Sequence, residues 1–165
     1  ARRLARLLGE QQLLLLCGHN EPLARRLKKL RRAAPHAVVG FTPDVGRYMD
    51  LADYFIGKPG PGSLSEAVHM GLPVITFSNA WTMPQERFNT RWVVDQGIGR
   101  VVRSVSALPE AVQGVLAELP ELRRRVQAID NRAVFEVPQI LAELLMRAAV
   151  PQRMPDVPQL SGALT

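Results

Sequence analysis

A glycine-rich loop with the sequence GKPGPG, residues 57–62, is followed by Ser63 and a stretch of helical periodicity. Glycines let the backbone approach a ligand closely, and a helix start offers free N–H groups and a partial positive charge. These properties suit a phosphate group, to which Lys58 could add a charge, although that side chain could also simply be solvated. The loop is not a Walker loop, because no Gly-Lys-Ser/Thr follows it. The sequence therefore predicts a phosphate site at Gly60, Gly62 and Ser63, with an ordinary turn as the alternative.

A carboxylate, Glu66, lies one helical turn beyond this loop. Its two oxygens can accept hydrogen bonds from both hydroxyls of a ribose, so it would suit the sugar of a nucleotide. The alternative is structural: Ser63 as N-cap with Glu66 three residues later has the pattern of a capping box. The two roles do not exclude each other.

Short apolar runs alternate along the chain with stretches of helical periodicity. The predicted strands are residues 12–17, 37–40, 54–56, 73–77 and 101–103. The predicted helices are residues 1–8, 21–33, 43–51, 63–70, 84–96, 106–116, 121–132 and 137–149. This order indicates an α/β fold of Rossmann-like type: an open parallel sheet with helices on both faces, which binds ligands at the carboxyl ends of its strands. We expect one domain over residues 1–149 and, because three prolines follow, a flexible tail over residues 150–165.

The composition excludes several classes of protein. The 165 residues are 47% hydrophobic and include one cysteine, which excludes wholesale disorder and a disulfide-stapled scaffold. No apolar run approaches the roughly 18 residues that a membrane span needs. The sequence starts without methionine or a hydrophobic signal core, so we expect it to be a piece of a longer protein.

Positive charge is concentrated at the beginning of the chain. Residues 1–34 hold nine Arg or Lys against two acids, a net charge of +7, whereas the remaining residues have a net charge of −1. Such a segment can attract nucleic acid, anionic lipid or an anionic ligand, or it can be a solvated helix face. Nucleic acid is disfavoured, because aromatic stacking residues are absent from the basic stretch.

The segment KPGPGSLSEA at residues 58–67, followed by GLPVI at residues 71–75, resembles the donor-binding, C-terminal half of GT-B glycosyltransferases. The likeness is strongest to the diacylglycerol glycosyltransferases of the monogalactosyldiacylglycerol synthase type, within the broader family 28. Three further stretches match this family: residues 17–20 (CGHN), the Met49 to Asp53 segment, and residues 84–89 (PQERFN). The resemblance covers roughly residues 10–105, with the motifs in the family's order and spacing.

The resemblance implies a nucleotide-sugar-binding domain and assigns a role to each matching position of the nucleotide site. Gly62 and Ser63 would hold the diphosphate, and Glu66 would accept from the ribose hydroxyls. Phe41 and Thr42 would border the uracil, largely through backbone groups.

The sugar would be recognised by a second loop. Gln85 and Glu86 would meet the sugar hydroxyls, and Asn89 would either contact the sugar or hold that loop. The alternatives are helix capping for Glu86 and solvent exposure for Gln85.

The stretch that contains Gly18, His19 and Asn20 would bring the loop after the first strand close to the phosphates. His19 departs from the family, whose members usually have Arg or Lys at this position. Because histidine is mostly neutral at pH 7, its contribution to phosphate neutralisation would be weaker and pH-dependent. An exposed loop histidine is the alternative.

The resemblance also implies the reaction: inverting transfer of a hexose from a UDP-sugar to a lipid acceptor such as diacylglycerol. The general base and the acceptor site would belong to an N-terminal domain that this sequence lacks, so the chain alone would bind donor without turning it over. No catalytic residue is identified in the chain, and no metal or other cofactor is expected, since no Asp-x-Asp motif is present.

The basic stretch from Arg25 to Arg32 could face anionic headgroups, as a membrane-acceptor enzyme at the cytoplasmic, inner face of a membrane would require. Two other functions stay open. One is a UDP-sugar 2-epimerase half domain, although residues 85–86 lack the Thr-Glu-Arg-Pro run expected there. The other is a non-catalytic nucleotide-binding module.

Overall fold

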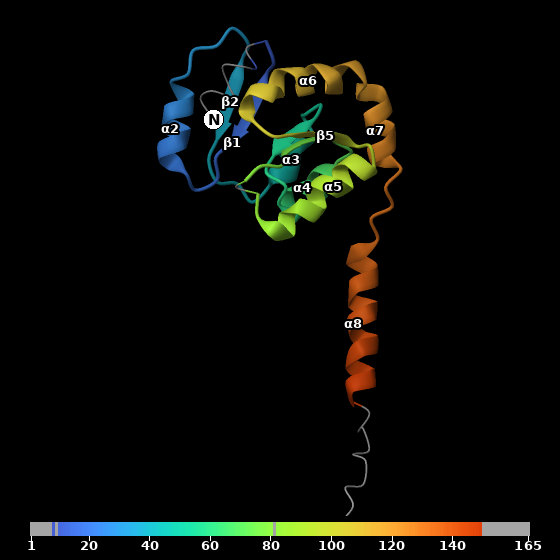
Figure 1. Ribbon diagram of the computed structural model, residues 1–165. Helices are drawn as coiled ribbons and strands as arrows, with labels where there is room; N and C mark the ends of the chain where they lie inside the picture. Colours follow the sequence, from blue (N-terminus) through green and yellow to red (C-terminus); the bar gives the residue numbers. More distant parts are fainter. Residues whose placement is uncertain (1–7, 9, 81, 150–165) are drawn as a thin grey trace, which may run out of the picture. The chain divides into compact units, whose positions relative to one another are not determined.

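A computed structural model describes residues 8, 10–80 and 82–149 (Figure 1). The chain forms two compact units, Ala1–Asp130 and Asn131–Thr165. The predicted helix over residues 1–8, apart from its last residue, and the predicted tail over residues 150–165 lie outside the described residues.

The strands of the first unit form two parallel sheets. In the first, β1 (Leu13–Leu16) pairs with β2 (His36–Val39). In the second, the order is β3 (Phe55–Gly57), β4 (Val74–Phe77) and β5 (Gly99–Val102). The predicted parallel α/β class is confirmed.

The predicted single open sheet is, within the described residues, divided between β2 and β3. Packing connects the two parts in place of a hydrogen-bonded ladder: Leu13 of β1 packs in the same apolar cluster as Tyr54 and Ile56. Side-chain burial can therefore hold two short sheets in one domain without a backbone ladder between them.

Eight helical segments connect and cover these strands in the described part of the first unit. They are α2 (Glu21–Lys28), α3 (Val45–Met49), α4 (Pro61–His69), the 3-10 turn η1 (Pro84–Glu86), α5 (Arg87–Asp95), η2 (Val105–Ala107), α6 (Leu108–Ala117) and α7 (Leu119–Gln127). The helix predicted over residues 21–33 is too long, because the chain leaves α2 after Lys28. The side chain of Arg32 then donates to the backbone of Gln11, in the segment before β1.

Helices cover both faces of the three-stranded sheet, as predicted (Figure 1). Val74 of β4 packs in a core cluster with residues of α3, α4, α5 and α7, whereas its neighbour Ile75 packs in another with residues of α6. At the β4–β5 contact a Cβ on Gly99 would lie 1.8 Å from the carbonyl oxygen of Val74, so only glycine fits there. The core thus fixes the sheet whose carboxyl ends carry the loops described below.

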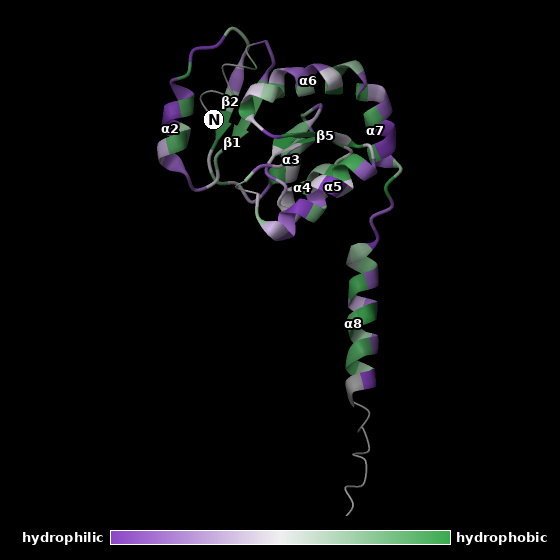
Figure 2. Cartoon of the chain, viewed as in Figure 1, coloured by the Kyte–Doolittle hydropathy of each residue, from purple (hydrophilic) through white to green (hydrophobic). Residues whose placement is uncertain are grey.

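The second unit contains α8, Ala133–Ala149, with Pro138 inside it. All of its side chains that the structure describes are exposed, including Phe135, Ile140 and Leu145. Hydrophobic residues occupy most of its length in Figure 2. Among the described helices, α8 included, none is long and apolar enough to cross a membrane.

Candidate functional site

The glycine-rich loop leads from β3 into α4 and leaves backbone donors free. Gly60 is the N-cap, and no side chain caps the helix. The first helical residue, Pro61, has no N–H, and the amide of Leu64 donates to the Gly60 carbonyl (3.1 Å). The N–H groups of Gly62 and Ser63 have no acceptor among the described residues. The start of α4 therefore has the chemistry of an anion site: two free donors at the positive end of a helix dipole.

The predicted capping box at Ser63 and Glu66 is wrong. Ser63 is the third residue of α4, not its N-cap, because Pro61 starts the helix three residues earlier than the capping pattern indicates. The Glu66 carboxylate is exposed, and the described part of the chain gives it no hydrogen bond or ion pair. The structural explanation for this glutamate is thereby removed, and its two oxygens are free to accept from a ligand.

A second carboxylate, Glu86, lies beside the same loop. Its side chain is 10% exposed, and its Oε1 lies 3.8 Å from the Nζ of Lys58, whose side chain is 76% exposed. None of the described residues donates a hydrogen bond to this carboxylate: Glu86 occupies the N-cap position of α5, but its side chain forms no capping hydrogen bond. Its oxygens keep some contact with solvent, because no fully buried side-chain oxygen or nitrogen among the described residues lacks a hydrogen-bond partner. Glu86 thus stands at the predicted cap position without the capping hydrogen bond, and its carboxylate has acceptor capacity left for a ligand hydroxyl.

Asn89 connects the two loops. Its Nδ2 donates to the backbone carbonyl of Pro59 at 2.8 Å, across 30 residues of sequence. The sequence left two roles for Asn89: contact with the sugar, or holding the loop of Gln85 and Glu86. This hydrogen bond shows Asn89 holding a loop, but the loop is the glycine-rich one. Gln85 is exposed, and its Nε2 donates to the Met83 sulfur at 3.7 Å.

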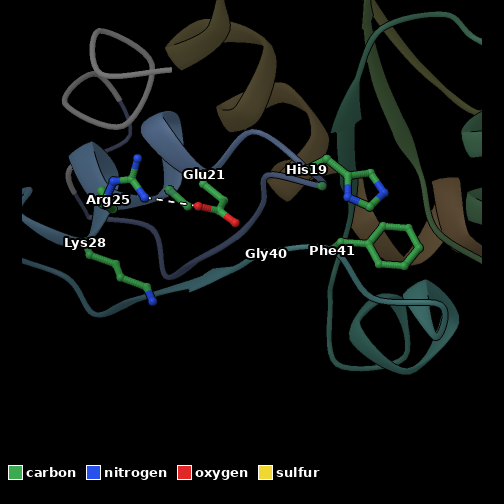
Figure 3. Close-up of a pocket in the computed structure, with 8 residues that line it drawn as sticks. His19, Glu21, Arg25, Lys28, Gly40 and Phe41 are labelled. Carbon is green, nitrogen blue, oxygen red and sulfur yellow. Dashed lines mark hydrogen bonds and ion pairs between the residues drawn. The ribbon is translucent and has the colours of Figure 1, made fainter.

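A further group of predicted residues gathers where β1 and β2 end. The rings of His19 and Phe41 stack with centroids 4.1 Å apart and an interplanar angle of 17°. Figure 3 shows the two rings face to face beside Gly40. They border a hollow of about 350 Å³ that is otherwise lined by Gly18, Glu21, Ala24, Arg25, Lys28 and Gly40.

The sequence did not indicate this stacked pair. The parallel register that sets Leu16 against Val39 brings the two following loops together. The sequence alone does not give this register. Residues 19 and 41 follow the ends of their strands by similar distances, so once the strands pair in this register their rings meet.

Two other predicted residues of these loops have structural contacts. The Asn20 side chain caps α2 by accepting from the amide of Leu23 at 3.0 Å. Thr42 Oγ1 accepts from the amide of Asp44 at 3.1 Å. Both contacts are local and stabilise the loops that follow β1 and β2.

The basic stretch from Arg25 to Arg32, which begins in α2 and continues beyond its end, divides into structural and exposed cations. The Arg32 guanidinium donates to the backbone carbonyls of Leu8, Gln11 (2.7 Å), Ala34 (3.5 Å) and Pro35 (3.3 Å), and desolvation lowers its pKa. Arg25 forms an ion pair with Glu21 at 3.1 Å. Arg32 is thus a structural residue and not part of a surface for headgroups. The exposed cations of the stretch are Arg25, within its ion pair, and Arg26, Lys28, Lys29 and Arg31.

The structure therefore brings Glu86 and Asn89 to the loop residues Lys58 and Pro59, beside Gly60, and stacks His19 on Phe41 in a second group. No group of His, Cys, Asp or Glu side chains suited to hold a metal ion occurs among the residues that the structure describes.

Comparison with known proteins gives a consistent result. A family model described as the glycosyltransferase family 28 C-terminal domain matches residues 1–144. A probable monogalactosyldiacylglycerol synthase, chloroplastic, from Glycine max is 32% identical over 151 residues, which cover 86% of this chain and 27% of that protein. The probable monogalactosyldiacylglycerol synthase 3, chloroplastic, from Oryza sativa subsp. japonica is 31% identical over 159 residues, which cover 93% of this chain and 30% of that protein.

The chain spans about a fifth to a third of the length of the curated relatives it matches. Among solved structures, the glycosyltransferase SnogD from Streptomyces nogalater is similar with a TM-score of 0.46 and 18% identity, covering 82% of this chain and 44% of that one. A glycotransferase of kitacinnamycin has a TM-score of 0.48 and 18% identity, covering 84% of this chain and 43% of that one.

Proposed function

The chain belongs to the glycosyltransferase family 28 C-terminal domain family, and we propose that it is the donor-binding half of a GT-B enzyme. The complete enzyme would transfer a hexose from a UDP-sugar to a lipid acceptor such as diacylglycerol, with inversion at the sugar carbon. The observation that carries the proposal is the start of α4: two free backbone donors, at Gly62 and Ser63, followed one turn later by the unpartnered carboxylate of Glu66.

The α4 start suits a nucleoside diphosphate. Phosphate oxygens would accept from the N–H groups of Gly62 and Ser63, and Gly60 lets the backbone come close. One helical turn rises about 5.4 Å, so a carboxylate three residues further along lies within reach of the ribose. Glu66 would accept from the two ribose hydroxyls, which are donors that a carboxylate without other partners can bind strongly.

The sugar would lie beyond the distal phosphate, next to η1. A hexose offers hydroxyl groups, which acidic and amide side chains recognise. The Glu86 carboxylate is nearly buried and lacks hydrogen-bond donors among the described residues, so a sugar hydroxyl would supply the donor that it lacks. Gln85, exposed next to it, would contribute an amide.

The uracil would lie at the ends of β1 and β2. Backbone groups around Phe41 and Thr42 would border the base, while the loop formed by Gly18, His19 and Asn20 would approach the phosphates. The stacked His19 and Phe41 rings support this assignment, because they hold the two loops together.

The chemical contribution of this half is stabilisation of the leaving UDP. In inverting transfer the acceptor hydroxyl attacks the anomeric carbon, the bond from that carbon to the phosphate oxygen breaks, and negative charge develops on the diphosphate. The helix start would stabilise that charge, together with Lys58 and, when protonated, His19. We propose no metal or other cofactor for this step. The base that takes the acceptor proton would come from a part of the enzyme outside this chain.

The lipid acceptor would likewise bind through the part of the enzyme outside this chain. The exposed cations of α2 and the segment after it would face an anionic membrane surface at the cytoplasmic, inner face of a membrane. Nucleic acid is not a proposed partner.

Calorimetric titration of the chain with UDP tests the proposal. Glu66→Ala should weaken UDP binding roughly ten- to a hundredfold, because it removes two charge-assisted hydrogen bonds. Glu110→Ala, which removes the same charge from an exposed position of α6, is the matched control and should leave the affinity unchanged. Equal affinities for all three chains, or no UDP binding by the unaltered chain, would refute the assignment.

A further inference from the structure

The loop that would bind the sugar is attached to the loop that would bind the diphosphate. Asn89 lies in the first turn of α5, and its Nδ2 donates to the Pro59 carbonyl at 2.8 Å. Pro59 and Gly60 are both buried. A hydrogen bond to a buried turn fixes the carbonyl that it holds, and so limits the conformations of the residues on either side.

A second contact joins the same two segments. The Oε1 of Glu86 would be 3.7 Å from a Cβ placed on Gly60, which is ordinary van der Waals distance, and it lies 3.8 Å from Lys58 Nζ. Two consecutive residues of the glycine-rich loop, Lys58 and Pro59, are therefore contacted by Glu86 and Asn89, and the Glu86 carboxylate lies beside the third, Gly60.

The position of the loop decides where the free donors of α4 point. Gly60 is the N-cap, and Gly62 and Ser63 follow it directly, with only Pro61 between. Since no side chain caps the helix start, the residues before Gly60 depend on contacts from outside the loop for their position. Asn89 supplies such a contact from the start of the next helix.

We propose that Asn89 is a positioning residue for the diphosphate: through the Pro59 carbonyl it holds the start of α4 in the conformation that presents the Gly62 and Ser63 amides. The inference rests on the proposed function of that helix start. Asn89 acts on the phosphates through the backbone, and it does not act as a direct ligand of the sugar. The two ends of the donor would thus be recognised by one connected structure.

The test compares backbone order with ligand binding. In the ligand-free chain, Asn89→Ala should lower the NMR order parameters of the Lys58, Gly60 and Gly62 amides, from the rigid value near 0.85 toward about 0.6. Asn89→Asp, which keeps the size of the side chain and loses the donor, should do the same. Gln85→Ala, a neighbouring exposed change, is the control and should leave these amides unaffected.

The binding measurement separates positioning from general loss of structure. Asn89→Ala should weaken UDP binding roughly three- to tenfold, the value of one hydrogen bond, while uridine, which lacks phosphates, should bind as before. Equal weakening of both ligands would indicate damage to the whole site and overturn the inference.

Two further outcomes would also contradict a positioning role. Unchanged order parameters would show that the Pro59 contact holds nothing. Unchanged UDP affinity with a lost preference for UDP-hexoses over UDP would make Asn89 a direct sugar ligand. If the unaltered chain binds no UDP, the proposed function fails and the assignment to a diphosphate fails with it, while the order parameters still show whether Asn89 holds the loop.

Discussion

Replacing Glu86 by glutamine should strengthen the binding of UDP. In the ligand-free structure the Glu86 carboxylate lies 3.8 Å from the Lys58 ammonium, next to the start of α4. A diphosphate bound there would compete with Glu86 for Lys58 and would also be repelled by the carboxylate. Glutamine keeps the shape of the side chain and removes the charge, so both unfavourable effects disappear.

The size of the effect follows from the geometry of the pair. At a separation of 3.8 Å, two unit charges interact by about 1 kcal/mol in water and by about 4 kcal/mol at an effective dielectric constant of 20. Because the Lys58 side chain is 76% exposed, the value for water is the appropriate one. A change of about 1 kcal/mol corresponds to roughly a fivefold lower Kd for UDP.

Isothermal calorimetry at low ionic strength measures this effect. In a Lys58→Ala background the same glutamine substitution should give a smaller gain in UDP affinity, because no ammonium remains to be released and only the repulsion between the carboxylate and the diphosphate is removed. Glu110→Gln on α6 controls for the change in net charge. At high salt the gain from Glu86→Gln should shrink, because exposed charges are screened. Weaker UDP binding by Glu86→Gln, or the same gain with and without Lys58, would refute the reasoning.

Three further predictions concern stability. Arg32→Ala should lower the free energy of unfolding by about 2 kcal/mol, because four backbone carbonyls lose a charged donor. In urea denaturation Arg26→Ala, an exposed neighbour, should show almost no change, and a similar loss in both variants would contradict the structural role. Gly99→Ala should lower the free energy of unfolding by about 3 kcal/mol or prevent folding, since its Cβ would overlap the Val74 carbonyl. Gly46→Ala, with open space around its Cβ, should instead raise the free energy of unfolding by about 0.5–1 kcal/mol. A chain ending at Asp130 keeps both core clusters, so its Tm should differ from that of the full chain by less than about 2 °C, and a larger fall would show that residues 131–165 stabilise the first unit.

Local sequence patterns predicted the order of the elements and most of their positions. The apolar runs at residues 12–17 and 73–77 correspond to β1 and β4, and the glycines at 71 and 97 end α4 and α5 with φ of +73° and +62°. These features depend on the residues in place and on their immediate neighbours. The division into two sheets depends on which strands pair, and pairing is set by contacts between distant parts of the chain.

The start of α4 shows how a local pattern can mislead. Ser63 and Glu66 have the spacing of a capping box, but Pro61, with its fixed φ, begins the helix earlier. Proline at the first helical position was the stronger indication in the sequence.

The remaining site contacts could not be predicted, because each joins distant residues. Asn89 and Pro59 are 30 positions apart, and the stacking of His19 on Phe41 depends on the register of β1 against β2. Arg32 looked like one of several cations on a basic stretch, and only the backbone carbonyls around it distinguish it from the others.

The central claim, that the start of α4 binds the diphosphate of a nucleotide, is tested most directly by following the backbone amides of the chain during an NMR titration with UDP. We expect saturable shifts that are largest at the amides of Gly62 and Ser63, with smaller ones at Glu66 and around Phe41, and no comparable response to uridine at the first two positions. Unchanged Gly62 and Ser63 amides at saturating UDP, or the largest shifts on another part of the chain, would contradict the account.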